Sequence, residues 1–244
     1  MADWQTSDAR DRVIVALDLE HDAALDLARK LQGHAGWMKV GMTLFYECGP
    51  AVVAELKELG FRIFLDLKFH DIPHQVRGAA RSAALTGADL MSVHSLGAGA
   101  MLAAAREGAD EAAQLRGAPV SLVGITVLTS MDQDALASIG VGDEVAAEVD
   151  RLASLAYGSG ANGVVCSPQE AARLRALLGA DALIVTPGVR PAGAALGDQS
   201  RVATPGDAMR AGASHVVVGR PITAAADPVA ACDAIIDEIA AALS

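Results

Sequence analysis

Eight short apolar runs recur along the chain of 244 residues, and an amphipathic stretch separates most of them from the next. The runs are continuously hydrophobic, which is typical of parallel strands that are buried on both faces. Parallel strands alternating with helices form βαβ units, and eight such units predict an α/β fold, a (β/α)8 TIM barrel, as a single domain. The predicted strands are Val13–Leu17, Trp37–Val40, Arg62–Leu67, Leu90–Val93, Val120–Val127, Gly163–Val165, Ala182–Val185 and His215–Val218.

The stretches between the runs are rich in Ala and Leu, carry Glu, Arg and Lys on one face, and are predicted to be helices. An open doubly wound sheet is the alternative, but it often carries a G-x-G-x-x-G motif after its first strand. Asp18-Leu19-Glu20 follows the first predicted strand here, without a glycine, so the barrel is favoured. Residues 1–11 are interpreted as a short N-terminal extension of one barrel domain over 1–244. The predicted helices include Asp22–Leu31, Ala51–Leu59, Ala79–Leu85, Ala100–Leu115, Val145–Tyr157 and Gln169–Leu178.

The net charge of the protein argues against a nucleic acid as its partner. Asp and Glu number 30 against 19 Lys and Arg, giving a formal net charge of −11, so the chain offers no general basic face to a nucleic acid. Cys48, Cys166 and Cys232 lie far apart, without metal-ligand spacing, and are predicted to be reduced. The polar N-terminus is unlike a signal peptide, and no apolar run approaches the length of a membrane span. We therefore expect a cytoplasmic protein without a membrane partner.

Asp66, Lys68 and Asp71 form a D-x-K-x-x-D array at the end of the third apolar run. If 62–67 is a strand, its side chains alternate between faces, so Asp66 and Lys68 point the same way. A carboxylate and an ammonium group in apolar surroundings are costly unless each is paired. One interpretation is a structural ion pair that closes the strand. Three acid or base residues within six positions favour chemistry instead.

Polar residues also follow the other predicted strands, at the end where barrel enzymes place their active sites. Loops after strands seven and eight are the usual phosphate-binding position in such barrels, and Arg can bind phosphate with two hydrogen bonds. Residues 191–199 between them are rich in Gly and Ala, as a mobile lid is. The rim residues are Asp18, Lys39, Asp66, Lys68, His94, Thr129, Ser130, Arg190, Gly219 and Arg220.

The histidines show no metal-ligand spacing, because neither H-x-x-H nor H-E-x-x-H occurs. His70 and His94 are interpreted as hydrogen-bonded structural residues. A nucleophile elbow and a Walker loop are also missing from the sequence. The histidine spacing therefore predicts a site without a zinc ion.

The order and spacing of several motifs resemble the orotidine 5′-phosphate decarboxylase family over nearly the whole chain. The motifs are Val15-Ala16-Leu17-Asp18, Lys39-Val40-Gly41, Phe64-Leu65-Asp66-Leu67-Lys68-Phe69-His70-Asp71-Ile72-Pro73, Val127-Leu128-Thr129-Ser130-Met131, Thr186-Pro187-Gly188-Val189-Arg190-Pro191, Gly197-Asp198-Gln199 and Gly219-Arg220-Pro221.

The resemblance implies a decarboxylase without cofactor or metal that converts orotidine 5′-phosphate to UMP in pyrimidine biosynthesis. Lys68 would be the proton donor in a charged network of Lys39, Asp66, Lys68 and Asp71, and Asp71 would reach the neighbouring site of a homodimer. Asp18 and Lys39 would hold the ribose, Thr129 and Ser130 would face the pyrimidine, and Arg190, Gln199, Gly219 and Arg220 would bind the phosphate. The full set of implied substrate-binding residues is Asp18, Lys39, Asp66, Lys68, Asp71, Ile72, Gln75, Thr129, Ser130, Pro187, Arg190, Gln199, Gly219 and Arg220.

One position departs from the family pattern. Where the family usually has Asn-Thr after Asp71-Ile72-Pro73, this chain has His74-Gln75. The family threonine contacts the ribose of the neighbouring subunit's ligand. The amide of Gln75 is able to make such a contact.

Three other functions fit parts of the pattern. A 3-hexulose-6-phosphate synthase type of enzyme also carries D-x-K-x-x-D but needs magnesium, whereas Leu128–Met131 and the lid resemble the decarboxylase. A Schiff-base aldolase would use Lys68 or Lys39 as its nucleophile, which borohydride trapping would detect. A phosphosugar-binding barrel without catalysis is the third, but a binder has no need for four charges at apolar strand ends.

Overall fold

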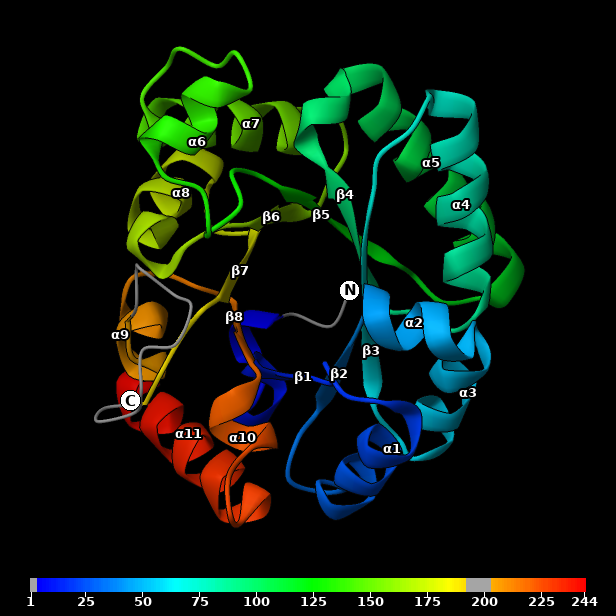
Figure 1. The fold of residues 1–244 in the computed structure, drawn as a ribbon, viewed down its shortest axis with the longest axis vertical. Helices are drawn as coiled ribbons and strands as arrows, with labels where there is room; N and C mark the ends of the chain where they lie inside the picture. The colour runs from blue at the N-terminus through cyan, green and yellow to red at the C-terminus, as the bar shows by residue number, and fades with distance from the viewer. Residues whose placement is uncertain (1–3, 192–202) are drawn as a thin grey trace.

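The computed structural model describes residues 4–191 and 203–244, and within them eight parallel strands close into a barrel, which confirms the predicted fold (Figure 1). Each strand pairs with the next along the chain, and β8 pairs with β1 to close the ring. The strands are β1 (Val13–Ala16), β2 (Trp37–Gly41), β3 (Arg62–Phe69), β4 (Leu90–His94), β5 (Ser121–Ile125), β6 (Gly163–Val165), β7 (Leu183–Pro187) and β8 (His215–Val218).

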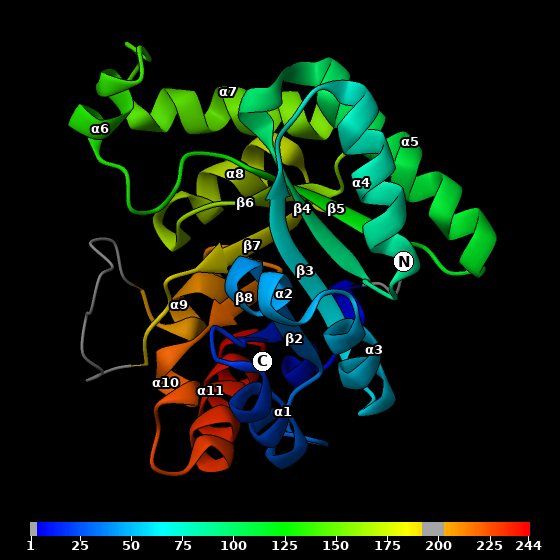
Figure 2. The same ribbon diagram turned by 45° about the vertical axis from the view of Figure 1, so that its right-hand side comes forward.

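Helices surround the ring of strands, and α4 and α5 lie side by side on one flank in both views (Figures 1 and 2). The α-helices are α1 (His21–Lys30), α2 (Met42–Cys48), α3 (Ala51–Glu58), α4 (Pro73–Leu85), α5 (Ala98–Arg116), α6 (Gln133–Ser138), α7 (Val145–Gly158), α8 (Ala171–Leu178), α9 (Pro205–Arg210), α10 (Arg220–Thr223) and α11 (Pro228–Leu243). The 3-10 helices are η1 (Trp4–Thr6), η2 (Ala9–Arg12), η3 (Ser95–Gly97) and η4 (Pro168–Glu170). None of the helices in these described ranges combines the length and apolarity that a membrane span requires.

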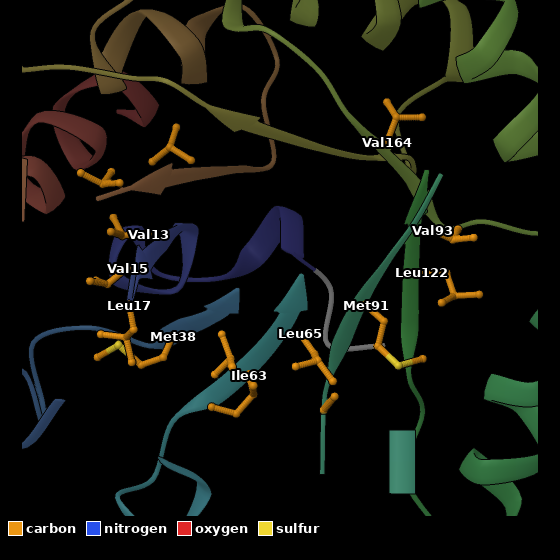
Figure 3. Packing of buried hydrophobic residues seen from close by; sticks show 14 of the residues in the cluster. Val13, Val15, Leu17, Met38, Ile63, Leu65, Met91, Val93, Leu122 and Val164 are labelled. Atoms are coloured by element: carbon orange, nitrogen blue, oxygen red, sulfur yellow. The ribbon is translucent and has the colours of Figure 1, made fainter. Parts of the chain in front are cut away.

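Side chains alternate between two hydrophobic layers along the strands. On β1, Val13 and Val15 belong to the large cluster between strands and helices, whereas Ile14 and Ala16 belong to a smaller cluster inside the barrel. Figure 3 shows the outer layer, to which Val13, Val15 and Leu17 contribute from β1 and the following residue. Both faces of β1 are thus buried, which explains why this apolar run is continuous in the sequence.

Several helices begin earlier than the sequence indicates, or were not predicted. Helix α4 begins at Pro73 instead of Ala79, with the proline in the first turn, where its missing N–H has no helical partner to lose. Its first turn is exposed and polar, so hydrophobic periodicity does not mark it. The short helices α2, directly after β2, and α6, after the loop that follows β5, carry one buried residue each, Leu44 and Leu136. Such segments give little periodic signal.

Residues from Trp4 onward cover the N-terminal end of the barrel. Trp4 packs against the inner cluster, and the guanidinium groups of Arg12 and Arg175 lie 5.3 and 4.7 Å from its ring centroid. Arg12 also donates a hydrogen bond to the carbonyl of Gln5. Residues 4–12 are therefore part of the folded barrel.

Strand β3 is longer than predicted and irregular where it carries the charged residues. It pairs with β4 at Leu65–Met91 and next at Phe69–Val93, so three residues of β3 face only Ser92 on β4. Within this bulge Lys68 has a φ of 52°, in the left-handed region that costs a non-glycine residue about 1–2 kcal/mol. Regular strand alternation therefore does not explain how the Asp66 and Lys68 side chains meet.

Candidate active site

A cavity of about 200 Å³ lies at the C-terminal end of the barrel. Its lining joins charged residues of β2 and β3 to apolar residues from the opposite strands, a composition that is common in sites for small molecules. The structure thus brings together, from separate strands, much of the charged set that the sequence predicts. The lining residues are Lys39, Phe64, Asp66, Lys68, Ile125, Val127, Leu128, Thr129, Val165, Pro187 and Val217.

Lys39 is buried and connects two carboxylates. Its Nζ lies 2.9 Å from Oδ1 of Asp18 and 3.8 Å from Oδ2 of Asp66. Gly41 leaves room for this arrangement, since a Cβ atom there would stand 3.0 Å from both Asp18 Oδ1 and Lys39 Nζ. The Lys39-Val40-Gly41 motif therefore supplies both the cation and the space around it.

Asp66 lies between the two lysines. Nζ of Lys68 donates to its Oδ2 at 2.9 Å, and the hydroxyl of Ser92 donates to its Oδ1 at 2.7 Å. The Ser92 hydroxyl in turn accepts the backbone N–H of Lys68 at 3.0 Å. Ser92 is not recognisable from the sequence, because one serine within an apolar run carries no distinctive signal.

Two ammonium groups flank the Asp66 carboxylate, and Lys39 is also paired with Asp18, so the formal charges of these two lysines and two aspartates balance. Side chains of Asp66 and Lys68 are 13% and 29% exposed, which weakens the screening of their charges by water. An ammonium group fixed in such a cavity is able to stabilise an anion and to donate a proton to it.

Asp71 is not brought to this cluster by its own chain. The residue is exposed after β3, and its Oδ1 accepts the backbone N–H of Ile72 at 2.6 Å. No ion pair between Asp71 and Lys68 occurs in the described part of the chain. Ile72 is 62% exposed, and Gln75 is exposed in the first turn of α4. These predicted substrate contacts all face away from the molecule's own interior.

The phosphate-binding residues of the prediction lie after the neighbouring strands β7 and β8. Gly219 precedes α10, and Arg220 is exposed as its first residue. Arg190 is only 9% exposed, and its Nη1 donates to the carbonyl of Val189 at 2.9 Å. Neither arginine belongs to the cavity lining. Gln199 and the predicted lid beyond Pro191 lie outside the described residues.

In the loop after β5 the structure separates the two predicted pyrimidine contacts. Thr129 is half-buried and lines the cavity, whereas Ser130 is exposed and is not among the lining residues. Pro187 lines the cavity from the end of β7.

His70 and His94 stack with ring centroids 5.2 Å apart, next to the cluster. Burial lowers the pKa of His94, and the neighbouring His70 and Lys68 lower it further. Nδ1 of His94 accepts the backbone N–H of Leu96 at 3.4 Å, so the ring caps η3. A neutral His94 adds no charge to the Lys68 site.

Among residues 4–191 and 203–244, no group of three or more His, Cys, Asp or Glu side chains is arranged to hold a metal ion. The cysteines are free, and burial raises the pKa of Cys166 and raises that of Cys232 to about 12. Their thiols are therefore protonated at neutral pH and poor nucleophiles.

Comparison with known proteins places this geometry in context. The profile of the orotidine 5′-phosphate decarboxylase / HUMPS family matches residues 11–235. An orotidine 5′-phosphate decarboxylase of Moorella thermoacetica is 52% identical over 235 residues, covering 95% of this chain and 93% of the relative. One from Halorhodospira halophila is also 52% identical, over 232 residues, covering 95% and 97%.

Solved structures show the same fold. The crystal structure of orotidine 5′-phosphate decarboxylase from Lactobacillus acidophilus has a TM-score of 0.82 and 40% identity, covering 94% of this chain and 99% of that one. The enzyme from Pyrococcus horikoshii has a TM-score of 0.73 and 26% identity, covering 93% and 98%.

Proposed function

The chain belongs to the orotidine 5′-phosphate decarboxylase / HUMPS family and is a carboxy-lyase of the decarboxylase type, and we propose that Lys68 is its proton donor. The reaction converts orotidine 5′-phosphate to UMP in pyrimidine biosynthesis. The observation that carries the proposal is the Lys39–Asp66–Lys68 cluster, which lies at the end of a cavity lined otherwise by largely apolar residues.

The chemistry needs a cation beside the reacting carbon. The bond between C6 of the pyrimidine and its carboxylate breaks, CO₂ leaves, and the electron pair remains on C6. The ammonium group of Lys68 stabilises this carbanion and then transfers a proton from Nζ to C6, and the neutral amine regains a proton from water. Asp66, beside the substrate carboxylate, disfavours the bound ground state.

Binding of the distant phosphate supports the same step. Enzymes lower activation barriers by roughly 8–23 kcal/mol, more than one ion pair supplies. Binding energy from Arg190, Gln199, Gly219 and Arg220 at the phosphate contributes when it is realised in the transition state. Asp18 and Lys39 hold the ribose, and Thr129 and Ser130 face the base.

Turnover of orotidine 5′-phosphate, followed by absorbance after exhaustive treatment with EDTA, tests the proposal. We expect full activity, because Lys68 supplies the positive charge that a metal otherwise brings. Loss of activity on chelation, with recovery on adding magnesium, would instead favour the sugar-phosphate lyase. Borohydride trapping of substrate on Lys68 or Lys39 would favour the aldolase, and binding of UMP without turnover would leave a phosphosugar-binding barrel.

We further propose a homodimer in which Asp71 completes the neighbouring site, with Ile72 and Gln75 beside it. The exposure of Asp71 and Ile72, and the separation of Asp71 from Lys68 within the described chain, support this arrangement. A two-fold interface exchanges equivalent residues between subunits, so both sites would gain an Asp71.

Subunit mixing tests the shared site. Inactive Asp71→Ala and Lys68→Ala chains, mixed in equal amounts, form hybrids in which one site carries both changes and the other carries neither. Activity should then reappear in up to about a quarter of all sites under random exchange. Hybrids that form and stay inactive would assign Asp71 to its own subunit.

A further inference from the structure

We propose that Ser92 is a positioning residue for the proton-transfer step, holding both the Asp66 carboxylate and the backbone of Lys68 in place. The inference rests on the proposed role of Lys68. Ser92 is fully buried on β4 and does not line the cavity, so it acts through these two neighbours instead of touching the substrate.

The first role of Ser92 is to accept a backbone N–H from the bulge in β3. Between the pairs Leu65–Met91 and Phe69–Val93, three residues of β3 face Ser92 alone, so the regular ladder is interrupted there. The N–H of Lys68 is directed to the Ser92 hydroxyl at 3.0 Å. A buried N–H without an acceptor is unfavourable, so this bond helps hold Lys68 at its φ of 52°.

The second task follows from the direction of the hydroxyl proton. Because Oγ of Ser92 accepts from Lys68, it is free to donate its proton to Oδ1 of Asp66, 2.7 Å away. This bond fixes the plane of the carboxylate and leaves Oδ2 facing Nζ of Lys68 at 2.9 Å and Nζ of Lys39 at 3.8 Å. The Ser92 hydroxyl therefore positions both the Asp66 carboxylate and the backbone of Lys68.

A serine at the opposite end of the barrel provides a matched control. Ser214 is also fully buried, accepts the N–H of Ile184 at 2.9 Å and donates to the carbonyl of Ile184 at 3.0 Å. Replacing either serine by alanine removes a buried hydroxyl that accepts a backbone N–H and donates to an oxygen. Ser214 also lies 3.0 Å from Nδ1 of His215, and only Ser92 contacts the Lys68 cluster.

The experiment compares Ser92→Ala, Ser214→Ala and Ser92→Thr with the unchanged protein in kcat, KM, UMP affinity and thermal unfolding. We expect Ser92→Ala to lose about 10²-fold in kcat, the scale of a misplaced catalytic group. KM and UMP affinity should change little, because the phosphate contacts lie on other loops. Ser214→Ala should keep its kcat while losing a similar amount of thermal stability, and Ser92→Thr should recover most of the lost kcat by restoring the hydroxyl.

Equal kcat for Ser92→Ala and Ser214→Ala would overturn the proposal, as would failure of a folded Ser92→Thr to recover activity. If either Ser92 variant does not fold, Ser92→Cys is measured in its place. A thiol is a weak donor and acceptor, so its kcat should lie between that of the unchanged protein and the loss expected for Ser92→Ala. An active Lys68→Ala would defeat the proposed function itself. An inactive Lys68→Ala beside a fully active Ser92→Ala would defeat only the positioning role.

Discussion

The two ends of the barrel hold cavities of nearly equal size but opposite character. The cavity at the N-terminal end measures about 190 Å³ and the one at the C-terminal end about 200 Å³. At the N-terminal end Arg62 pairs with Asp11 and lies 4.7 Å from the ring centroid of Trp37. Asp89 there accepts hydrogen bonds from Lys57 and from the N–H of Ile63, both at 2.8 Å.

The charged residues that line the N-terminal cavity, Arg62 and Asp89, have their ion-pair partners outside the lining. At the C-terminal end Lys68 and its partner Asp66 both line the cavity, together with Lys39. An ammonium group that lines an otherwise largely apolar cavity stabilises an anion that develops beside it. Cavity volume alone therefore does not distinguish the two ends; the lysine ammonium groups in the lining of the C-terminal cavity do.

Lysine at each end gives the sharpest test of this contrast. Lys68→Ala should lower kcat by roughly 10²–10⁴-fold, the range of general acid–base catalysis, while UMP still binds. Lys57→Ala, which removes one of the two ion-pair partners of Asp89, should leave kcat unchanged and lower the unfolding temperature. Steady-state kinetics, UMP titration and thermal unfolding measure both. More than about a hundredth of the activity in Lys68→Ala would end the assignment of the proton donor.

Arginines extend the comparison to binding. Arg220→Ala should weaken UMP by about 10–10²-fold, since hydrogen bonds to charged groups contribute about 1.5–3 kcal/mol, and should barely change the binding of uridine. Arg62→Ala should alter neither affinity. Calorimetric titration with the two ligands measures the difference. Equal losses for UMP and uridine would make Arg220 a structural residue.

Acid should affect the N-terminal end through His215, whose burial lowers its pKa to about 3, with Arg62 and Arg12 adding to the effect. Its folded pKa lies below its unfolded one, so the unfolded chain binds the extra proton and stability falls as pH falls below about 6.5. Between pH 7 and pH 5 this amounts to about 2 kcal/mol.

Denaturant unfolding of the natural protein and of His215→Gln measures that slope. The variant should lose the contribution of His215, while burial of His94 keeps a slope of the same sign in both. Identical slopes would show that His215 is not responsible.

Two glycines give the smallest expected effects. A Cβ at Gly41 crowds Asp18 and Lys39, so Gly41→Ala should lower kcat/KM by about threefold to tenfold, or about 1 kcal/mol, with little change in stability. A Cβ at Gly36 collides with Oδ1 of Asp11, the partner of Arg62. Gly36→Ala should therefore lower the unfolding temperature and spare kcat/KM. The reverse pattern would contradict the division between the two ends.

Much of the fold was predictable because a strand that is buried on both faces has a continuously apolar sequence. The barrel and its eight strands were predicted with ends within a few residues. The charged C-terminal end of β3 was not predicted. Lys68 and Phe69 continue the strand through a bulge, and the pattern of apolar residues does not indicate a bulge. The polar first turn of α4 escaped for a similar reason.

The site was predictable to the extent that its residues are chemically conspicuous. Lys39, Asp66 and Lys68 lie close together because they stand at the ends of neighbouring strands. Ser92 and Gly41 escaped, because their contributions are one hydrogen-bonding hydroxyl and one missing methyl group, and only the folded geometry reveals them. The roles of Asp71, Arg190, Gln199 and Arg220 stay predictions.

The left-handed φ of Lys68 has a consequence for laboratory evolution. Glycine adopts this backbone conformation without the steric cost of about 1 kcal/mol or more that lysine carries. A library at position 68 screened only for heat resistance would therefore be expected to move away from lysine. The same library grown without uracil would retain lysine, because that screen requires UMP. Selection for a heat-resistant fold and selection for pyrimidine synthesis would therefore favour different residues at position 68.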